Sequence, residues 1–413
     1  MRKKYHRFNR LTGSITKALG LTFLLTGSNM SFAGQEVLSK ADQFFDKVAI
    51  SGYLSQGIQS VEADDGAFDL EDSNMSAGFN RFRYALGFDI ELNDQVTAFV
   101  ELSEEPNDFG VDYTPHVDLA LINVALNEQL TVQLGTIVTV LFNFRGYSDG
   151  AVVQGNPLIG NSPADMVTAA EGMKLIGNYG DFHWDLGVSS SDFGESFGGD
   201  RGLTYLARGS YDFNEYFSLG FGLASSRHGD QVRNGSSDII RAGLYQGDGD
   251  NYRFRSSDTG GIRNTHAGVI PGLDSTALHI DGQYQTEQTT IRLWAGQVKD
   301  DFSFADSNGL ATVASLSQGF IEQESEMRFI GLEASYYFTE KFYAASRYVL
   351  VENKAEGVRR DEQLSRSQLG IGYFYRDNML IKAELVNQME QENSAGQIGD
   401  DWQGVMMEMS FIF

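Results

Sequence analysis

Apolar and polar residues alternate along much of the chain. In the last twelve residues, "WQGVMMEMSFIF", large apolar side chains occupy one parity: Val405, Met407, Met409, Phe411 and Phe413. The other parity carries Gly404, Glu408 and Ser410. Successive side chains of a β-strand point to opposite faces, so this period of two predicts a strand with one apolar face. Residues 79–92 and 182–190 alternate in the same way.

Seven tight connections join such segments in pairs, each with an acidic residue at its third position: LNDQ at 92–95, LNEQ at 126–129, YGDF at 179–182, FNEY at 213–216, QTEQ at 285–288, FTEK at 338–341 and YRDN at 375–378. Short polar connections between alternating segments are typical of β-hairpins. Together with the segments at the two ends, they predict sixteen strands: 47–60, 79–92, 95–103, 116–126, 129–136, 171–179, 182–190, 202–213, 216–227, 275–285, 288–299, 326–338, 341–353, 363–375, 378–390 and 402–413.

Eight longer connections separate the hairpins: 61–78, 104–115, 137–170, 191–201, 228–274, 300–325, 354–362 and 391–401. Short and long connections therefore alternate along the chain. A transmembrane up-and-down barrel has an even number of strands, short turns at its periplasmic rim and long loops at the other. The pattern favours an all-β transmembrane antiparallel up-and-down β-barrel of about 16 strands. A soluble β-sandwich gives no reason for its loops to be sorted in this way.

Aromatic residues gather at or beside the short connections. Twelve lie there: Tyr179, Phe182, Phe213, Tyr216, Phe217, Tyr337, Phe338, Phe342, Tyr343, Phe374, Tyr375 and Phe413. Membrane barrels carry an aromatic girdle at the membrane interface. Aromatic residues also favour strands in general, so ordinary β-rich usage is the alternative. Clustering on one rim favours the girdle.

The first 33 residues are typical of an export signal. Basic residues precede the apolar stretch "ALGLTFLLTG", and Ser31-Phe32-Ala33 forms a small-x-small cleavage site. We expect a cleaved signal peptide at 1–33, a periplasmic lead-in at 34–46 and a single β-barrel domain at 47–413. The alternative is an uncleaved anchor, although the apolar stretch is about half the ~20 residues that a spanning helix needs.

Composition excludes several classes of function. Removal of residues 1–33 takes away six basic and no acidic residues, which changes the net charge from −25 to −31. Nucleic-acid binding needs clustered Lys and Arg, so no nucleic-acid partner is expected. The chain has no cysteine, which excludes disulfides and thiol chemistry.

Residue types that enzymes and metal sites use are sparse and scattered. The five histidines outside the signal are His116, His183, His228, His266 and His279, and no two have the close spacing of a zinc motif. No phosphate-binding loop is present, and the two Gly-x-Ser-x-Gly stretches, at 146–150 and 194–198, lie within long connections and not between a strand and a helix. We therefore expect no enzyme activity, no cofactor and no metal. The alternative is a barrel-embedded hydrolase with Ser and His together on one rim.

The third long connection, 137–170, differs from the others in composition. It is about 34 residues long and moderately apolar, and its only charged residues are Arg145, Asp149 and Asp165. A long connection with Val, Leu, Ile and Phe is expected to pack against a surface, and the barrel interior offers one. We predict that this loop folds into the lumen and narrows the channel. Packing over the rim or against a neighbouring chain is the alternative.

Charged residues on the strands define a candidate filter. Basic residues with the parity opposite to the more apolar face are Arg81, Arg83, Lys174, Arg208, Arg292, Arg347, Arg366 and Lys382, with Arg347 the least clear because it alternates with Val349 and Val351. Acidic residues of the same parity are Asp89, Glu91, Glu101, Asp118, Asp281, Glu333, Glu384 and Glu408. A basic residue on the lipid face costs roughly 2–4 kcal/mol at mid-membrane, so these side chains should line the pore. Opposed charges across a pore set its ion preference. Mutual pairing along the wall is the alternative.

Several segments resemble Gram-negative outer-membrane porins. "IKAELVNQMEQ" followed by "WQGVMMEMSFIF" is similar to the closing hairpin of the phosphate-selective porin O and P family. "LTVQLGTI" followed by "GMKLIGNYGDFHWDLGVSSS" is similar to the region around the inward-folded third loop of that family. The C-terminal residues Met409, Phe411 and Phe413 resemble the signal that the barrel assembly machinery recognises.

The resemblance implies a sixteen-stranded homotrimer in the outer membrane, with one channel per subunit for small hydrophilic solutes. The phosphate preference does not transfer, because that family uses an Arg ladder and a Lys cluster, whereas residues 137–170 hold one Arg and no Lys. We expect passive diffusion of small hydrophilic solutes and ions. The alternatives are a substrate-specific channel for an anion or sugar, with Trp294 and Tyr53 as possible stacking residues, and a non-conducting surface or adhesion protein that uses the loop 228–274.

Overall fold

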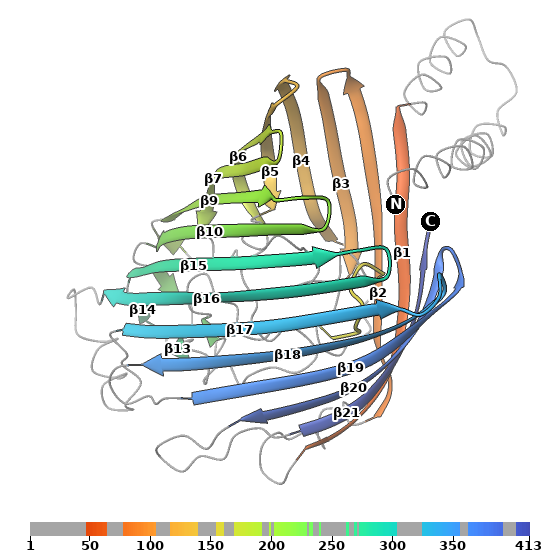
Figure 1. The fold of residues 1–413 in the computed structure, drawn as a ribbon. Helices are drawn as coiled ribbons and strands as arrows, with labels where there is room; N and C mark the ends of the chain where they lie inside the picture. The colour runs from red at the N-terminus through yellow and green to blue at the C-terminus, as the bar shows by residue number, and fades with distance from the viewer. Residues whose placement is uncertain are drawn as a thin grey trace, which may run out of the picture.

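The structure is a computed structural model that describes residues 47–63, 77–104, 116–138, 154–160, 169–191, 198–199, 202–228, 231–233, 239–240, 262–263, 268–270, 272–303, 324–355, 362–390 and 402–413. Over these ranges the chain forms a closed barrel of sixteen strands (Figure 1). In order around the barrel they are β1 (Val48–Ala63), β2 (Ala77–Asn93), β3 (Val96–Glu104), β4 (His116–Asn127), β5 (Leu130–Val138), β6 (Ala169–Tyr179), β7 (Phe182–Ser191), β9 (Gly202–Asp212), β10 (Phe217–His228), β15 (Gly272–Gln285), β16 (Thr289–Ser303), β17 (Glu324–Tyr337), β18 (Phe342–Ala355), β19 (Glu362–Arg376), β20 (Met379–Glu390) and β21 (Trp402–Ile412).

Each barrel strand pairs antiparallel with the next, and β21 closes the ring against β1. The closing register runs from Tyr53 opposite Ile412 to Ala63 opposite Trp402. A closed ring leaves no strand edge with unpaired backbone groups. The sixteen predicted strands and their up-and-down order are confirmed. Their ends differ from the prediction by at most four residues, and the larger differences lie at the long-loop ends.

Strand side chains alternate between an exposed apolar face and a buried face that carries most of the charge. On β17, Ile330 and Leu332 are about half exposed, whereas Phe329 and Glu333 are buried. On β21, Met407 and Met409 are exposed, whereas Glu408 is buried. Because interior and exterior positions alternate in a closed barrel, the exposed set forms the outer surface and the buried set the inner surface.

The second residue of most hairpin connections organises the turn. The Asn93 Oδ1 atom accepts hydrogen bonds from the backbone N–H groups of Gln95 and Val96, at 2.9 and 3.0 Å. Asn214 makes the same pair of bonds to Tyr216 and Phe217. Asn127, Thr286 and Thr339 act similarly. Asn and Thr side chains stabilise turns in this way, so this position explains the repeated turn better than the acidic third position.

Five short strands lie within two of the predicted long connections. They are β8 (Gly198–Gly199), β11 (Gln231–Arg233), β12 (Ile239–Ile240), β13 (Ile262–Arg263) and β14 (Gly268–Ile270). A three-stranded sheet has the order β14-β11-β8, and β12 pairs with β13. Hydrogen bonding therefore joins part of the connection 191–201 to part of the connection 228–274, which the alternation pattern did not predict.

The aromatic side chains near the short turns divide between the two surfaces. Phe213, Phe338, Tyr375 and others are exposed on the outer surface, where Phe213 and Phe338 also contact neighbouring aromatic rings. Tyr343 is instead buried on the inner surface with Leu380, and Tyr337 and Phe374 pack against the cluster that they form. Three of the twelve predicted girdle residues are thus part of an inner cluster. The alternation of side chains along each strand decides whether an aromatic residue faces the outer or the inner surface.

Candidate functional site

The inner surface holds the basic side chains that the strand parity predicts. Arg83, Lys174, Arg208, Arg347, Arg366 and Lys382 are buried there. Arg292 is 19% exposed. The Arg81 side chain lies outside the described residues, although its backbone pairs with Gly57 in the wall. Val349 and Val351 are buried on the same face as Arg347, so the inner surface is partly apolar beside this arginine.

Glu333 on β17 lies between two arginines from the flanking strands. Its Oε2 atom is 2.8 Å from Arg347 Nη2 and 3.0 Å from Arg347 Nε. Its Oε1 atom is 3.0 Å from Arg292 Nη1. The strand register places the three residues in one row, because Glu333 pairs with Arg292 on β16 and with Arg347 on β18. One carboxylate therefore faces two guanidinium groups.

Two further ion pairs lie on the inner surface. Arg208 Nη2 is 2.8 Å from Asp281 Oδ2, and His279 Nε2 is 3.1 Å from the same oxygen. Lys382 Nζ is 2.8 Å from Glu408 Oε1. A buried charge is tolerated when it is paired and hydrogen-bonded. The alternative interpretation, that basic and acidic side chains pair along the wall, therefore applies to four of the predicted basic residues: Arg208, Arg292, Arg347 and Lys382.

Residues 154–160, "QGNPLIG", lie against the inner surface of β18 to β20 through polar contacts. Arg347 donates to Gly160 O at 2.8 Å and to Asn156 Oδ1 at 2.9 Å. Glu384 Oε2 accepts from the N–H groups of Ile159 and Gly160, at 2.5 and 3.3 Å. Lys382 Nζ donates to Leu158 O at 3.1 Å. We name this set of contacts between residues 154–160 and the wall the clamp.

Apolar packing completes the clamp. Leu158 is buried in a cluster with Tyr343, Ala345 and Leu380. The Tyr343 hydroxyl also donates to Pro157 O at 3.0 Å. Gly370 on β19 leaves room for Leu158, because a Cβ atom there would lie 2.7 Å from Leu158 Cδ2. Residues 154–160 are therefore held by hydrogen bonds, charge and packing together.

The clamp residues were only partly foreseen. Arg347, Lys382 and Glu384 were predicted to be inner-wall residues, but their contacts with residues 154–160 were not. The charged residues predicted for the same connection, Arg145, Asp149 and Asp165, lie outside the described residues. A sequence signal for the clamp exists in "QGNPLIG", a turn-rich and uncharged stretch that contains two large apolar residues.

Two aromatic residues considered as sugar-stacking groups are buried on the inner surface. Trp294 is 2% exposed and its indole lies over Gly331, where a Cβ atom would be 2.2 Å from the ring. Tyr53 is buried next to Ala85. A ring that already covers a glycine and is shielded from solvent offers no open face to a solute. These two residues therefore do not support a sugar site.

Within the part of the chain that the structure describes, no group of three or more His, Cys, Asp and Glu side chains could hold a metal ion. His279 contacts Asp281 and stacks on Phe329, with 6.2 Å between the ring centroids. His183 contacts Asn178 and Asp212 near the short-turn rim. Among the described residues, no helix is long and apolar enough to cross a membrane.

Neither a family model nor a curated protein matches the chain. Solved structures do match. OmpT, an outer membrane protein of Vibrio cholerae, with its loop L8 deleted, superposes with a TM-score of 0.57 at 12% identity, over 89% of this chain and 99% of that chain. The anion-selective porin from Comamonas acidovorans gives a TM-score of 0.54 at 14% identity, over 89% and 99%. The outer membrane channel DcaP of Acinetobacter baumannii gives 0.56 at 12% identity, over 88% and 97%.

Similarity at these identities concerns the fold. The chain has the fold of outer-membrane porins and channels, along nearly the whole length of the proteins it resembles. The narrower resemblance to the phosphate-selective porin O and P family stays a prediction.

Proposed function

We propose that the protein is an outer-membrane porin, a water-filled channel for passive diffusion of small hydrophilic solutes and ions. The closed sixteen-strand barrel, apolar and exposed outside and charged inside, carries this proposal. An apolar outer surface suits lipid, and a charged inner surface suits water and ions. The porin fold of the similar structures supports the same function.

The connection 137–170 narrows this channel. Its described part, residues 154–160, is fixed to the inner surface of β18 to β20 by the clamp. A loop that is attached to one wall at mid-length reduces the open cross-section. Arg145, Asp149 and Asp165 belong to the same connection and are proposed to lie at the narrow part of the channel.

Ion preference is proposed to be weak. Arg208, Arg292, Arg347 and Lys382 each lie within 3.0 Å of a carboxylate, so their fields largely cancel at a distance. The proposed basic lining of the channel also includes Arg81, Arg83, Lys174 and Arg366. A channel with paired wall charges passes small solutes of either sign, and its exact preference depends on the few charges beside the narrow part.

Export, location and assembly follow from the same proposal. A cleavable signal peptide at 1–33 leads the chain to the periplasm, and the barrel assembly machinery recognises its C-terminal strand. The subunits form a homotrimer. The strands β3 to β7 support this, since they are 9 to 12 residues long, whereas β15 to β19 have 14 or 15. The part of the barrel wall that these shorter strands form is suited to contact with other subunits. OmpT of Vibrio cholerae is described in a trimer form.

Conductance in a planar lipid bilayer tests the channel. Detergent-refolded protein should produce stepwise openings, commonly in groups of three, and an unheated gel band near three times the monomer mass should collapse on boiling. A reversal potential measured in a salt gradient should be small. Persistent silence of a protein that shows the folded, heat-sensitive gel band would contradict the channel and favour a surface or adhesion protein.

A further inference from the structure

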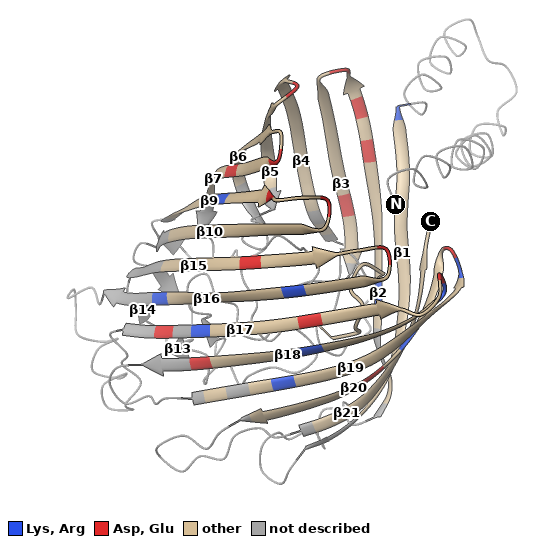
Figure 2. Cartoon of the chain, in the orientation of Figure 1, with Lys and Arg blue, Asp and Glu red and all other residues tan. Residues whose placement is uncertain are grey.

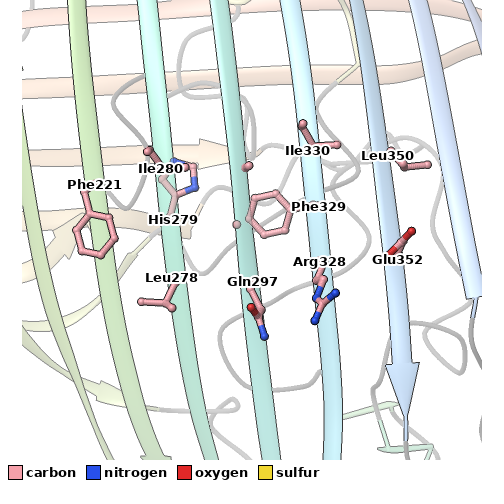
Figure 3. A pocket seen from close by; sticks show the side chains of 12 residues that line it. Phe221, Leu278, His279, Ile280, Gln297, Arg328, Phe329, Ile330, Leu350 and Glu352 are labelled. Atoms are coloured by element: carbon pink, nitrogen blue, oxygen red, sulfur yellow. The ribbon is translucent and has the colours of Figure 1, made fainter.

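A groove of about 560 Å³ runs across the outer surface of the strands β15 to β18. The strand register explains it. On the outer surface, Ala295 of β16 lies in one row between Ile280 of β15 and Ile330 of β17, followed by Leu350 of β18. A small residue between large neighbours leaves a trough. Figure 3 shows the apolar walls of this trough, formed by Phe221, Leu278, Ile280, Ile330 and Leu350.

The floor of the groove is thin. Gly296, next to Ala295, has no side chain, and the Phe329 ring lies over it from the inner surface, where a Cβ atom would be 2.3 Å from Phe329 Cζ. Most lining side chains nevertheless belong to the outer surface, including the exposed Phe221, Leu278, Ile280 and Ile330. The groove therefore opens away from the channel.

Charged residues begin at the loop end of the groove. In Figure 3, Gln297 and Arg328 lie at the end toward which β18 runs, the end of the long loops. Arg328 shares the parity of the exposed Ile330 and its side chain is 53% exposed. Lys299 is 64% exposed and lies 3.5 Å from Glu326, which also pairs with Arg328. Figure 2 shows these charges on β16 and β17 beside the loop ends.

The position of Arg328 along β17 matches the edge of a hydrocarbon layer. Nine residues, Phe329–Tyr337, separate it from the short-turn end of the strand. A membrane-spanning strand needs about 9–11 residues. On β16, Gln297 is the ninth residue from Thr289, so it lies at a comparable depth. The apolar part of the groove thus falls inside the hydrocarbon layer and the charges fall at its border.

We infer that this groove holds one acyl chain of an anionic lipid, with the phosphate of its headgroup near Arg328 and Lys299. The inference depends on the proposed location in a membrane. The apolar walls suit a hydrocarbon chain, and the cations at the border suit a headgroup of opposite charge. A phosphate accepts hydrogen bonds from the guanidinium of Arg328 and competes with Glu326 for it. Glu352 at the same end sets one limit, because it disfavours a headgroup with several negative charges on that side.

Native mass spectrometry of the refolded, intact barrel tests this inference. Protein is mixed with detergent micelles that contain phosphatidylglycerol or phosphatidylcholine, or with inorganic phosphate alone, and bound mass is measured after washing. The unchanged protein should retain one phosphatidylglycerol per subunit, little phosphatidylcholine and no phosphate. Ala295→Phe fills the trough and should reduce retention at least tenfold. Arg328→Gln should reduce the preference for phosphatidylglycerol over phosphatidylcholine.

Ala383→Phe is the matched control, because Ala383 is also on the outer surface but lies on β20, next to Ile371 and Met407. It should retain lipid as the unchanged protein does. The heat-sensitive gel band checks that each variant is folded. Equal retention by Ala295→Phe and the unchanged protein would overturn the inference, as would binding of phosphate alone. A folded Ala295→Phe monomer that still shifts on heating but forms no trimer would show that a second copy covers the groove, and would also overturn the inference.

Failure of the channel proposal can be distinguished from failure of this one. A silent barrel that still retains phosphatidylglycerol in the groove supports the lipid site and contradicts the channel. A conducting barrel that retains no lipid contradicts the site alone.

Discussion

Arg347 Nη2 lies 2.8 Å from Glu333 Oε2, and the same guanidinium donates to Gly160 O through Nη1 at 2.8 Å. One side chain therefore joins two strands of the wall to the described part of the third long connection. Its planar fork suits this geometry, since it presents several N–H donors in fixed directions. A lysine would keep the charge and lose most of these directions.

Arg347→Lys should loosen the clamp. The substitution removes hydrogen bonds to Asn156 and Gly160, and bonds from a charged group are worth roughly 1.5–3 kcal/mol each. We expect more current noise and brief changes in conductance in single-channel recordings, because residues 154–160 would leave the wall more often. Arg292→Lys is the control, since Arg292 also pairs with Glu333 but lies on β16, outside the strands β18 to β20 that form the clamp. Equal noise in both variants would show that the ion pair with Glu333, and not the clamp, steadies the channel.

Gly370→Ala should displace Leu158. The added methyl group would lie 2.7 Å from Leu158 Cδ2 and 3.2 Å from the carbonyl oxygen of Ala383, and overpacking of this kind costs about 1–3 kcal/mol. We expect a change in mean single-channel conductance, measured in the same planar bilayers. Gly282→Ala is the control, because a Cβ atom there meets nothing closer than 3.6 Å. Conductance that stays the same in the folded Gly370→Ala variant would exclude residues 154–160 from the narrow part.

Asp281→Asn should move the ion preference toward anions. The change removes the charge that faces Arg208 at 2.8 Å and leaves the arginine as a net positive charge on the inner surface. Fields near a pore act over a Debye length of about 8 Å at physiological salt, so the effect should weaken at high salt. The reversal potential in a salt gradient should shift by several millivolts in the anion-selective direction. Asp212→Asn is the control, because Asp212 contacts His183 near the short-turn rim. This variant should shift the reversal potential less than Asp281→Asn does. If the reversal potential of Asp281→Asn does not change even at low salt, Arg208 and Asp281 lie away from the ion path.

Arg83 should contribute to the same preference. It is buried on the inner surface of β2, which pairs with β1 next to the closing seam. Arg83→Gln removes a positive charge, so the reversal potential should move toward cations, opposite to Asp281→Asn. The double variant with Arg81→Gln should move it further. An unchanged reversal potential in both would remove these two arginines from the ion path.

The sequence predicted the barrel well because membrane strands repeat one simple rule. Every strand needs one apolar face, so Met407 and Met409 reveal their orientation from parity alone. Turn positions such as Asn93 and Asn214 also leave a local signal. The strand ends at the long loops were predicted less accurately. For example, β16 continues four residues past its predicted end, to Ser303. Beyond the hydrocarbon layer the alternation is no longer enforced.

The clamp and the outer groove could not be predicted in the same way. The clamp joins residues far apart in the chain, such as Ile159 and Glu384, which are 225 positions apart, and no local period encodes such a contact. The groove depends on the register that places Ala295 between Ile280 and Ile330. Register across strands is fixed by the whole barrel, so a single strand shows only that Ala295 is small.

Deletion of Phe413 should impair assembly more than it alters the channel. Phe413 follows β21 and lies at the seam with β1, where its N–H donates to Gly52 O at 3.0 Å and its carbonyl accepts from Gly52 N at 3.1 Å. Its ring covers Gly52, where a Cβ atom would be 2.7 Å from Phe413 Cζ, and stacks on Phe411. Deletion removes two hydrogen bonds at the seam and the ring, whereas Phe413→Ala removes the ring alone.

The folded fraction, measured from the heat-sensitive gel band after refolding, should therefore decrease from the unchanged protein to Phe413→Ala and further to the deletion. Any barrel that does fold should keep its conductance, because the Phe413 side chain is exposed at the end of the wall. In cells, the deletion should lower the amount in the outer membrane more than it lowers refolding in detergent, since recognition of the C-terminal strand is lost as well. Equal losses in both settings would assign Phe413 a role in the seam alone.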